Sequence, residues 1–133
     1  MSGTHDLAPS LADIDTMARA VFESIPEEFS HVARDVVIRV VDFPDNETMA
    51  EMALETPFDL LGLYRGVPFG DKSVGGAPQD VDMIMLYRRP LLDYWCETEE
   101  SLHGLVRHVL IHEIGHHFGL SDDDMARIET AEN

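Results

Sequence analysis

The sequence predicts a single α+β domain, and three observations support this prediction. The chain has 133 residues, of which 44% are hydrophobic, enough for one core and little beyond it. Two largely apolar stretches, "VVIRVVDF" (36–43) and "VDMIMLY" (81–87), are typical of strands. The last third is helical, so strands precede helices without a regular βαβ alternation. We expect one domain over residues 1–133, with residues 1–9 as a flexible tail.

The first helix is expected to start at Leu11, because apolar residues then recur at three- and four-residue intervals. These residues are Leu11, Ile14, Met17, Ala18, Val21 and Phe22. Pro26 interrupts the pattern, since proline breaks helix interiors. A short helical turn through Phe29 and Val32 is a further expectation. After the strand at 36–43, the acidic segment that runs to Glu55 predicts a weak helix or a loop.

The middle of the chain is punctuated by glycine and proline. "FDLLGLYRGVPFG" (58–70) mixes apolar residues with three glycines and a proline, which predicts an irregular hairpin or loop. "DKSVGGAPQD" (71–80) predicts an exposed loop. Pro90 is expected to stop the strand at 81–87, because proline cannot donate to a sheet.

The final third predicts two helices. Thr98 is a candidate N-cap for the first, and an apolar stripe follows it. The stripe consists of Leu102, Leu105, Val106 and Val109. Gly119 is expected to end this helix in a left-handed conformation. Ser121 is a good N-cap for a last helix over 122–130.

"HEIGHHFGLSDDD" (112–124) carries the residues with the clearest chemistry. His112 and His116 are four residues apart, so they project from one side of a helix, about 40° apart, and can reach one ion. Glu113 can place its carboxylate on a water bound to that ion, as in zinc hydrolases of the H-E-x-x-H type. The alternative is that both histidines are hydrogen-bonded core residues and Glu113 is an exposed helix former. A carboxylate on an apolar helix face is unfavourable unless it is paired, protonated or close to a metal. A nearby metal ion removes this cost for Glu113, which favours the metal site.

A catalytic zinc site needs a third protein ligand and an open fourth position. A chain reversed at Gly119 brings Asp122 toward the metal, so we predict Zn²⁺ bound by His112, His116 and Asp122. The alternative account of Asp122 is that it favours the N-terminus of the last helix, and both accounts can hold together. Asp123 and Glu129 are the other candidates for the third ligand. His108, one turn before His112, is expected to neighbour a ligand at most.

Charge and cysteine content exclude several classes of protein. Nine basic and 26 acidic residues give 9 − 26 = −17, which disfavours nucleic acid and anionic membranes as partners. No apolar stretch reaches the roughly 18 residues of a membrane span, and the start does not resemble a signal peptide. Cys96 is the single cysteine, so an internal disulfide is excluded and a cytoplasmic location is expected. It also makes a structural zinc site closed by four protein ligands an unfavoured alternative.

The chain resembles the small bacterial zincin-like metallopeptidases, sometimes described as a minimal metalloprotease fold. The resemblance runs from about residue 17 to 125 and is carried by "LLGLYRGVP" (60–68), "LYRRPLL" (86–92) and "HEIGHHFGLSD" (112–122). It implies a compact α+β domain with a small mixed sheet packed with helices, and a zinc site at the helix. On the family pattern, His112, His116 and Asp122 match ligand positions and Glu113 matches the catalytic glutamate.

These residues predict a zinc-dependent peptidase in which Glu113 takes a proton from a zinc-bound water. An anionic third ligand lowers the charge of the site to about +1, so we expect modest activity on flexible or unfolded peptides. Eleven residues after Asp122 leave no room for the methionine turn of metzincins, and Met125 comes too early for one. The alternative function is therefore a metal-binding interaction or regulatory module with weak or no catalysis. The oligomeric state is not predicted.

Two further expectations concern the substrate. The strand at 81–87 is expected to lie along the cleft and to pair with an extended peptide. The candidates for stabilising the oxyanion are Tyr64, Tyr87, Arg88 and Tyr94, although packing or a surface ion pair is the better explanation for any single one.

Overall fold

The computed structural model describes residues 7–26, 36–69 and 79–131, with the backbone alone at 66–69, 79–81, 116–118 and 129–131. The elements in chain order are α1 (Leu11–Glu23), β1 (Val37–Val41), α3 (Asn46–Glu51), β2 (Gly62–Phe69), β3 (Gln79–Tyr87), α4 (Arg88–Cys96), α5 (Leu102–Phe118) and α6 (Asp122–Ala131). The turn expected through Phe29 and Val32 lies outside the described residues.

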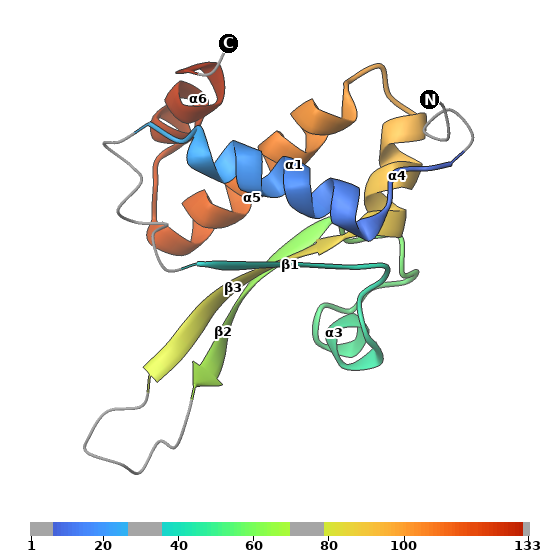
Figure 1. Ribbon diagram of the computed structural model, residues 1–133. Helices are drawn as coiled ribbons and strands as arrows, with labels where there is room; N and C mark the ends of the chain where they lie inside the picture. Colours follow the sequence, from blue (N-terminus) through green and yellow to red (C-terminus); the bar gives the residue numbers. More distant parts are fainter. Residues whose placement is uncertain (1–6, 27–35, 70–78, 132–133) are drawn as a thin grey trace.

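The described strands form a three-stranded mixed sheet in the order β1-β3-β2 (Figure 1). β1 pairs with β3 in parallel, Ile38 opposite Ile84, and β2 pairs with β3 antiparallel, Tyr64 opposite Ile84. The predicted α+β class with a small mixed sheet is therefore confirmed. β3 is the central strand, so its backbone donors and acceptors serve its two neighbours. The expectation that the strand at 81–87 pairs with a peptide is wrong for this reason.

β2 corrects the prediction of an irregular hairpin or loop over 58–70, because residues 62–69 form one regular strand. Proline cannot donate to a strand pair and is confined to edge strands, whereas glycine weakens a strand without excluding it. Among the described strands β2 pairs only with β3, so it is an edge strand that tolerates these residues. Gly62 also has a packing role, because a Cβ there would lie 2.7 Å from Cγ1 of Val109 in α5.

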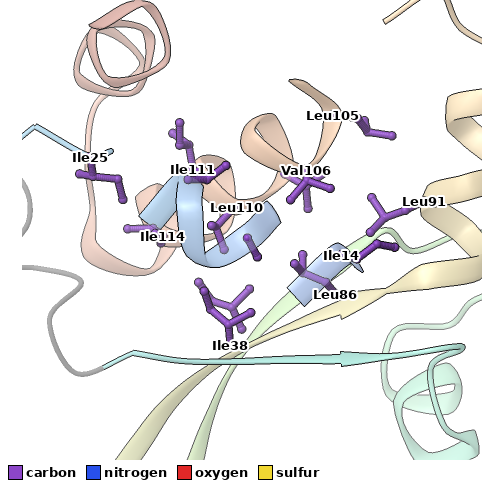
Figure 2. Close-up of a cluster of buried hydrophobic side chains, with 14 of the residues drawn as sticks. Ile14, Ile25, Ile38, Leu86, Leu91, Leu105, Val106, Leu110, Ile111 and Ile114 are labelled. Carbon is purple, nitrogen blue, oxygen red and sulfur yellow. The ribbon is translucent and has the colours of Figure 1, made fainter. Parts of the chain in front are cut away.

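Helices α1 and α5 cover one face of the sheet and enclose the core, as Figures 1 and 2 show. The interior-facing members of β1 and β3 are Ile38, Ile84 and Leu86. They meet Ile14 from α1 and a long set from α5: Leu102, Leu105, Val106, Val109, Leu110, Ile111 and Ile114. The part of α5 from Val109 to Ile114 thus has buried side chains on several sides of the helix.

Helix starts follow local capping chemistry. α1 begins with a capping box in which Ser10 accepts a hydrogen bond from the backbone of Asp13 and Asp13 accepts one from Ser10. α5 begins at Ser101, whose hydroxyl accepts from the backbone N–H of Gly104 at 2.9 Å, so the predicted N-cap at Thr98 is wrong by three residues. Serine is a somewhat better N-cap than threonine, so local preference already favours Ser101.

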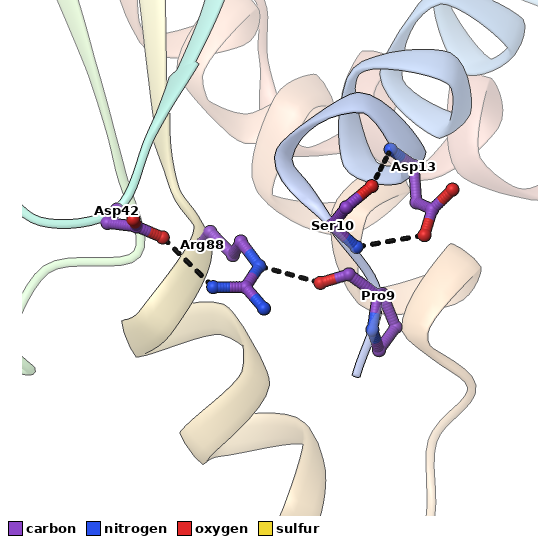
Figure 3. A network of polar contacts seen from close by, with 5 residues as sticks. All are labelled: Pro9, Ser10, Asp13, Asp42 and Arg88. Carbon is purple, nitrogen blue, oxygen red and sulfur yellow. Dashed lines mark hydrogen bonds and ion pairs between the residues drawn. The ribbon is translucent and has the colours of Figure 1, made fainter. Parts of the chain in front are cut away.

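α4 was not predicted, because Pro90 suggested only the end of a strand. Proline is tolerated in the first turn of a helix, and Pro90 is the third residue of α4. Arg88 at the start of α4 donates from Nη1 to Asp42 at 3.0 Å and from Nε to the carbonyl oxygen of Pro9 at 2.6 Å (Figure 3). This contact ties the residue before the α1 cap to the end of the sheet.

The other face of the sheet carries a polar cluster under α3. Thr48 is 1% exposed, and its hydroxyl accepts from Nη1 of Arg65 at 2.9 Å. Nη2 of Arg65 forms an ion pair with Glu51 at 3.2 Å. Tyr87 is 2% exposed, and burial raises the pKa of its phenol. In the described part of the chain, no helix has both the length and the apolar character needed to cross a membrane.

Candidate metal and peptidase site

Helix α5 supplies the residues that define the candidate site. Its apolar side packs against α1 and the sheet, so its position is set by the core. The helix ends at Gly119, whose φ of 72° confirms the predicted left-handed cap. A Cβ at Gly119 would meet nothing within 4 Å, so backbone conformation and not space requires glycine there.

Glu113 lies half-buried at the interface between α5 and β2. Its Oε1 accepts a hydrogen bond from the backbone N–H of Tyr64 at 3.0 Å. Gly62 allows this approach, because its missing side chain lets Val109, one turn before Glu113, lie directly on β2. The alternative in which Glu113 is a simple exposed helix former does not fit this contact.

The donor N–H of Tyr64 points to the free side of β2. The backbone N–H of Tyr87 donates to the carbonyl oxygen of Leu61 at 3.0 Å, which makes Leu61 and Tyr87 a hydrogen-bonded pair. Hydrogen-bonded and non-hydrogen-bonded pairs alternate along an antiparallel ladder, so the pair of Tyr64 and Ile84 is of the non-hydrogen-bonded kind. Glu113 therefore binds at the edge of the sheet.

Asp82 is a second carboxylate on this side of the sheet. It alternates in phase with Ile84 and Leu86, whose side chains face the helices. The hydroxyl of Tyr64 donates to Oδ1 of Asp82. Asp82 was not predicted as a site residue, although an acid in phase with two buried strand residues is a signal visible in the sequence.

His112 is half-buried and lies against His108. The two ring centroids are 4.1 Å apart with an interplanar angle of 35°. His108 is exposed and one turn earlier, so its ring limits the orientations open to the imidazole of His112. This is the neighbouring role that the sequence suggested for His108.

The segment after Gly119 forms an N-cap for helix α6, as one of the two predictions for it stated. Ser121 accepts from the backbone N–H of Asp124 at 3.0 Å, and its own N–H donates to Oδ2 of Asp124 at 3.4 Å. Helix α6 then starts at Asp122, which is exposed together with Asp123. The capping role of Ser121 is confirmed, and the ligand role of Asp122 stays a prediction.

The side chains of His116 and Glu129 lie outside the described residues, so their ligand roles stay predictions as well. Among the described side chains, no three of the His, Cys, Asp and Glu types gather into a metal-binding group. The donor chemistry nevertheless fits zinc, because two imidazoles at i and i+4 of a helix and a carboxylate after its C-terminus are ligand types that zinc accepts. Cys96 is exposed at the end of α4 and is not part of such a group.

Three of the four oxyanion candidates have other partners or are buried. Tyr87 is buried on the face of the sheet opposite to α5. Arg88 binds Asp42 and Pro9, and the hydroxyl of Tyr64 donates to Asp82. Tyr94 is exposed on α4. These contacts agree with packing or ion pairing as the better explanation for Tyr87, Arg88 and Tyr64.

This fold and this helix define a zincin-like protein, and comparison with known families agrees. The family model for zincin-like metallopeptidases matches residues 33–131, which is most of the chain. The protein belongs to this family. No curated protein sequence matches it.

Proposed function

We propose that the protein is a zinc-dependent peptidase acting on flexible or unfolded peptides, with Glu113 as the general base. The observation that carries this proposal is the position of Glu113, which is half-buried, next to His112 and held at the edge of a strand. His112, His116 and Asp122 would hold the zinc ion. When bound, zinc would polarise the scissile carbonyl group and make a water molecule more acidic.

Glu113 moves the protons of the reaction. Its carboxylate accepts the proton of the attacking water and passes it to the leaving nitrogen, which requires the ionised form at the start. The N–H of Tyr64 orients this carboxylate through a hydrogen bond to its Oε1. With an anionic third ligand we expect modest activity.

We infer that the substrate binds along β2. Among the described strands β2 pairs on one side only, so an extended peptide can add to its outer backbone groups beyond the N–H of Tyr64, which Glu113 binds. The net charge of −17 favours cationic peptides over nucleic acid or anionic membranes as partners. The lone Cys96 suits a reducing compartment such as the cytoplasm.

The first experiment measures zinc per chain in protein purified without chelator and without a nickel column. We expect about one zinc in the wild type and in Asp123→Ala, and much less in Asp122→Ala. Asp123 is the matched control, since it is also exposed in the first turn of α6. Equal zinc in all three proteins would remove Asp122 from the ligand set.

The second experiment exposes an unbiased peptide library to the wild type and to Glu113→Gln, both loaded with zinc. A peptidase gives cleavage products that disappear in Glu113→Gln. Identical profiles for both proteins would instead support the alternative function, a metal-binding interaction or regulatory module.

A further inference from the structure

We infer that Tyr64 and Asp82 form a positioning pair for Glu113: Asp82 fixes Tyr64 on the sheet, and the backbone N–H of Tyr64 fixes the carboxylate of the general base. The inference rests on the proposed function for its consequence in catalysis. Its structural part rests on two hydrogen bonds that meet at one residue, from the N–H of Tyr64 to Glu113 and from its hydroxyl to Asp82.

The register of β2 and β3 explains why the backbone at Tyr64 is held by a side-chain hydrogen bond to Asp82. Tyr64 and Ile84 form a non-hydrogen-bonded pair, so the backbone of Tyr64 makes no ladder bond to β3 at this point. The N–H is instead directed outward to Glu113. The phenol reaches diagonally to Asp82, two residues before Ile84 on β3, and connects the two strands through side chains.

The pair also joins elements that are far apart in the sequence. Asp82 is 18 positions from Tyr64, and Glu113 is 49 positions from Tyr64. The chain of contacts runs from the central strand to the edge strand and on to α5. A displacement of β2 at Tyr64 therefore moves the anchor of the base directly, and small displacements of a catalytic group have large effects on rate.

Three variants separate the parts of the pair. Tyr64→Phe removes the hydroxyl and keeps the ring and the backbone N–H. Asp82→Ala removes the acceptor, and Asp82→Asn keeps an acceptor oxygen but removes the charge. We expect kcat to fall about tenfold in Tyr64→Phe and in Asp82→Ala, less in Asp82→Asn, with KM and zinc content unchanged. The double variant should be no slower than the slower single variant, because both changes break one connection.

Hydrogen exchange of backbone amides gives a readout that does not depend on activity. Glu113→Ala serves as reference, since it removes the acceptor from the amide at position 64. In Tyr64→Phe and Asp82→Ala we expect exchange at position 64 to rise part of the way to this reference. The amides at positions 63 and 65 should stay protected, because they belong to hydrogen-bonded pairs with β3.

Several outcomes would overturn the inference. Unchanged exchange at position 64 would show that Asp82 and the phenol do not hold the anchor. Equal increases at positions 63, 64 and 65 would show a general loosening of the strand pair. Loss of zinc in Asp82→Asn, but not in Tyr64→Phe, would make Asp82 a metal ligand instead.

Failure of the proposed function is recognised separately. A wild type that cleaves peptides no better than Glu113→Gln rejects the peptidase. Localised exchange at position 64 would still support the structural link among Asp82, Tyr64 and Glu113. An active wild type with unchanged kcat in Tyr64→Phe and Asp82→Ala rejects the positioning role alone.

Discussion

The two faces of the sheet each hold a polar cluster, and the clusters differ in how they treat carboxylates. On the α5 face, Glu113 accepts a hydrogen bond from a backbone N–H and Asp82 accepts one from a phenol. On the α3 face, Glu51 is paired with Arg65, which neutralises it.

This difference separates a cluster suited to chemistry from one suited to stability. On the α5 face, Glu113 lies next to His112, a predicted metal ligand, whereas the ion pair on the α3 face ties a helix to a strand. On the α3 face, the buried hydroxyl of Thr48 completes the coordination of Arg65 and connects α3 to β2. We therefore expect substitutions on the α5 face to change activity first and those on the α3 face to change stability first.

The largest expected effect compares glutamates on the two faces. Glu113→Gln should lower peptide cleavage by about 10²-fold or more, because the amide cannot accept the proton of water. Glu51→Gln should leave cleavage within about twofold, since it loses only an exposed ion pair. Initial rates on one fluorogenic peptide check both, with zinc content and thermal melting as controls. Equal rates for Glu113→Gln and Glu51→Gln would contradict the comparison.

Gly62→Ala tests the approach of α5 to the sheet. The added Cβ would lie 2.7 Å from Cγ1 of Val109 and 3.1 Å from the carbonyl oxygen of Met85, so the free energy of unfolding should fall by about 1–3 kcal/mol. Urea denaturation measures the change. When Val109 is also changed to alanine, Gly62→Ala should lower the free energy of unfolding by less. An unchanged loss in the Val109→Ala background would mean that the contact with Val109 does not cause it.

Thr48→Val tests the cluster on the α3 face. Valine keeps the shape but leaves Nη1 of Arg65 without its buried acceptor, which should cost about 1–3 kcal/mol of unfolding free energy. Thr48→Ser keeps the hydroxyl and is the matched control for the hydrogen bond. If valine and serine were equally stable, the hydroxyl would not matter to this face.

Tyr87→Phe has the smallest expected effect and shows itself only at alkaline pH. The pKa of Tyr87 is raised by burial above its ordinary value near 10, so the folded state keeps its proton longer than the unfolded state does. The stability of the wild type should therefore fall as pH rises from about 10 through the folded pKa. Tyr87→Phe lacks this loss. As pH rises above about 10, the free energy of unfolding of Tyr87→Phe should therefore increase relative to that of the wild type. Parallel curves of stability against pH would contradict the raised pKa.

The sequence predicted what is local along the chain. The left-handed cap at Gly119 and the Ser121 cap of α6 are both found, because each depends on a few neighbouring residues. The spacing of His112 and Glu113 on one helix is likewise a local property. The match of the family model to residues 33–131 agrees with the resemblance that these residues carry.

What depends on strand order was not predictable from periodicity. Which strand occupies the centre is decided by pairing across the chain, so β3 was mistaken for the strand that receives a peptide. The glycines of β2 suggested a loop, although one of them serves the contact with α5. Asp82 was missed because its partner Tyr64 lies on another strand.

The contact between Tyr64 and Glu113 also has a consequence for the folding of the newly synthesised chain. Tyr64 and Glu113 are 49 positions apart, so we expect their contact to form late in folding, after local helices have appeared. On the proposed function, a nascent chain can thus carry its proposed zinc ligands before Glu113 is held in place. On the proposed function, the protein's own unfinished segments are the nearest flexible peptides. The protein then becomes an active peptidase only when those segments are ordered, and this order of events limits self-cleavage during folding.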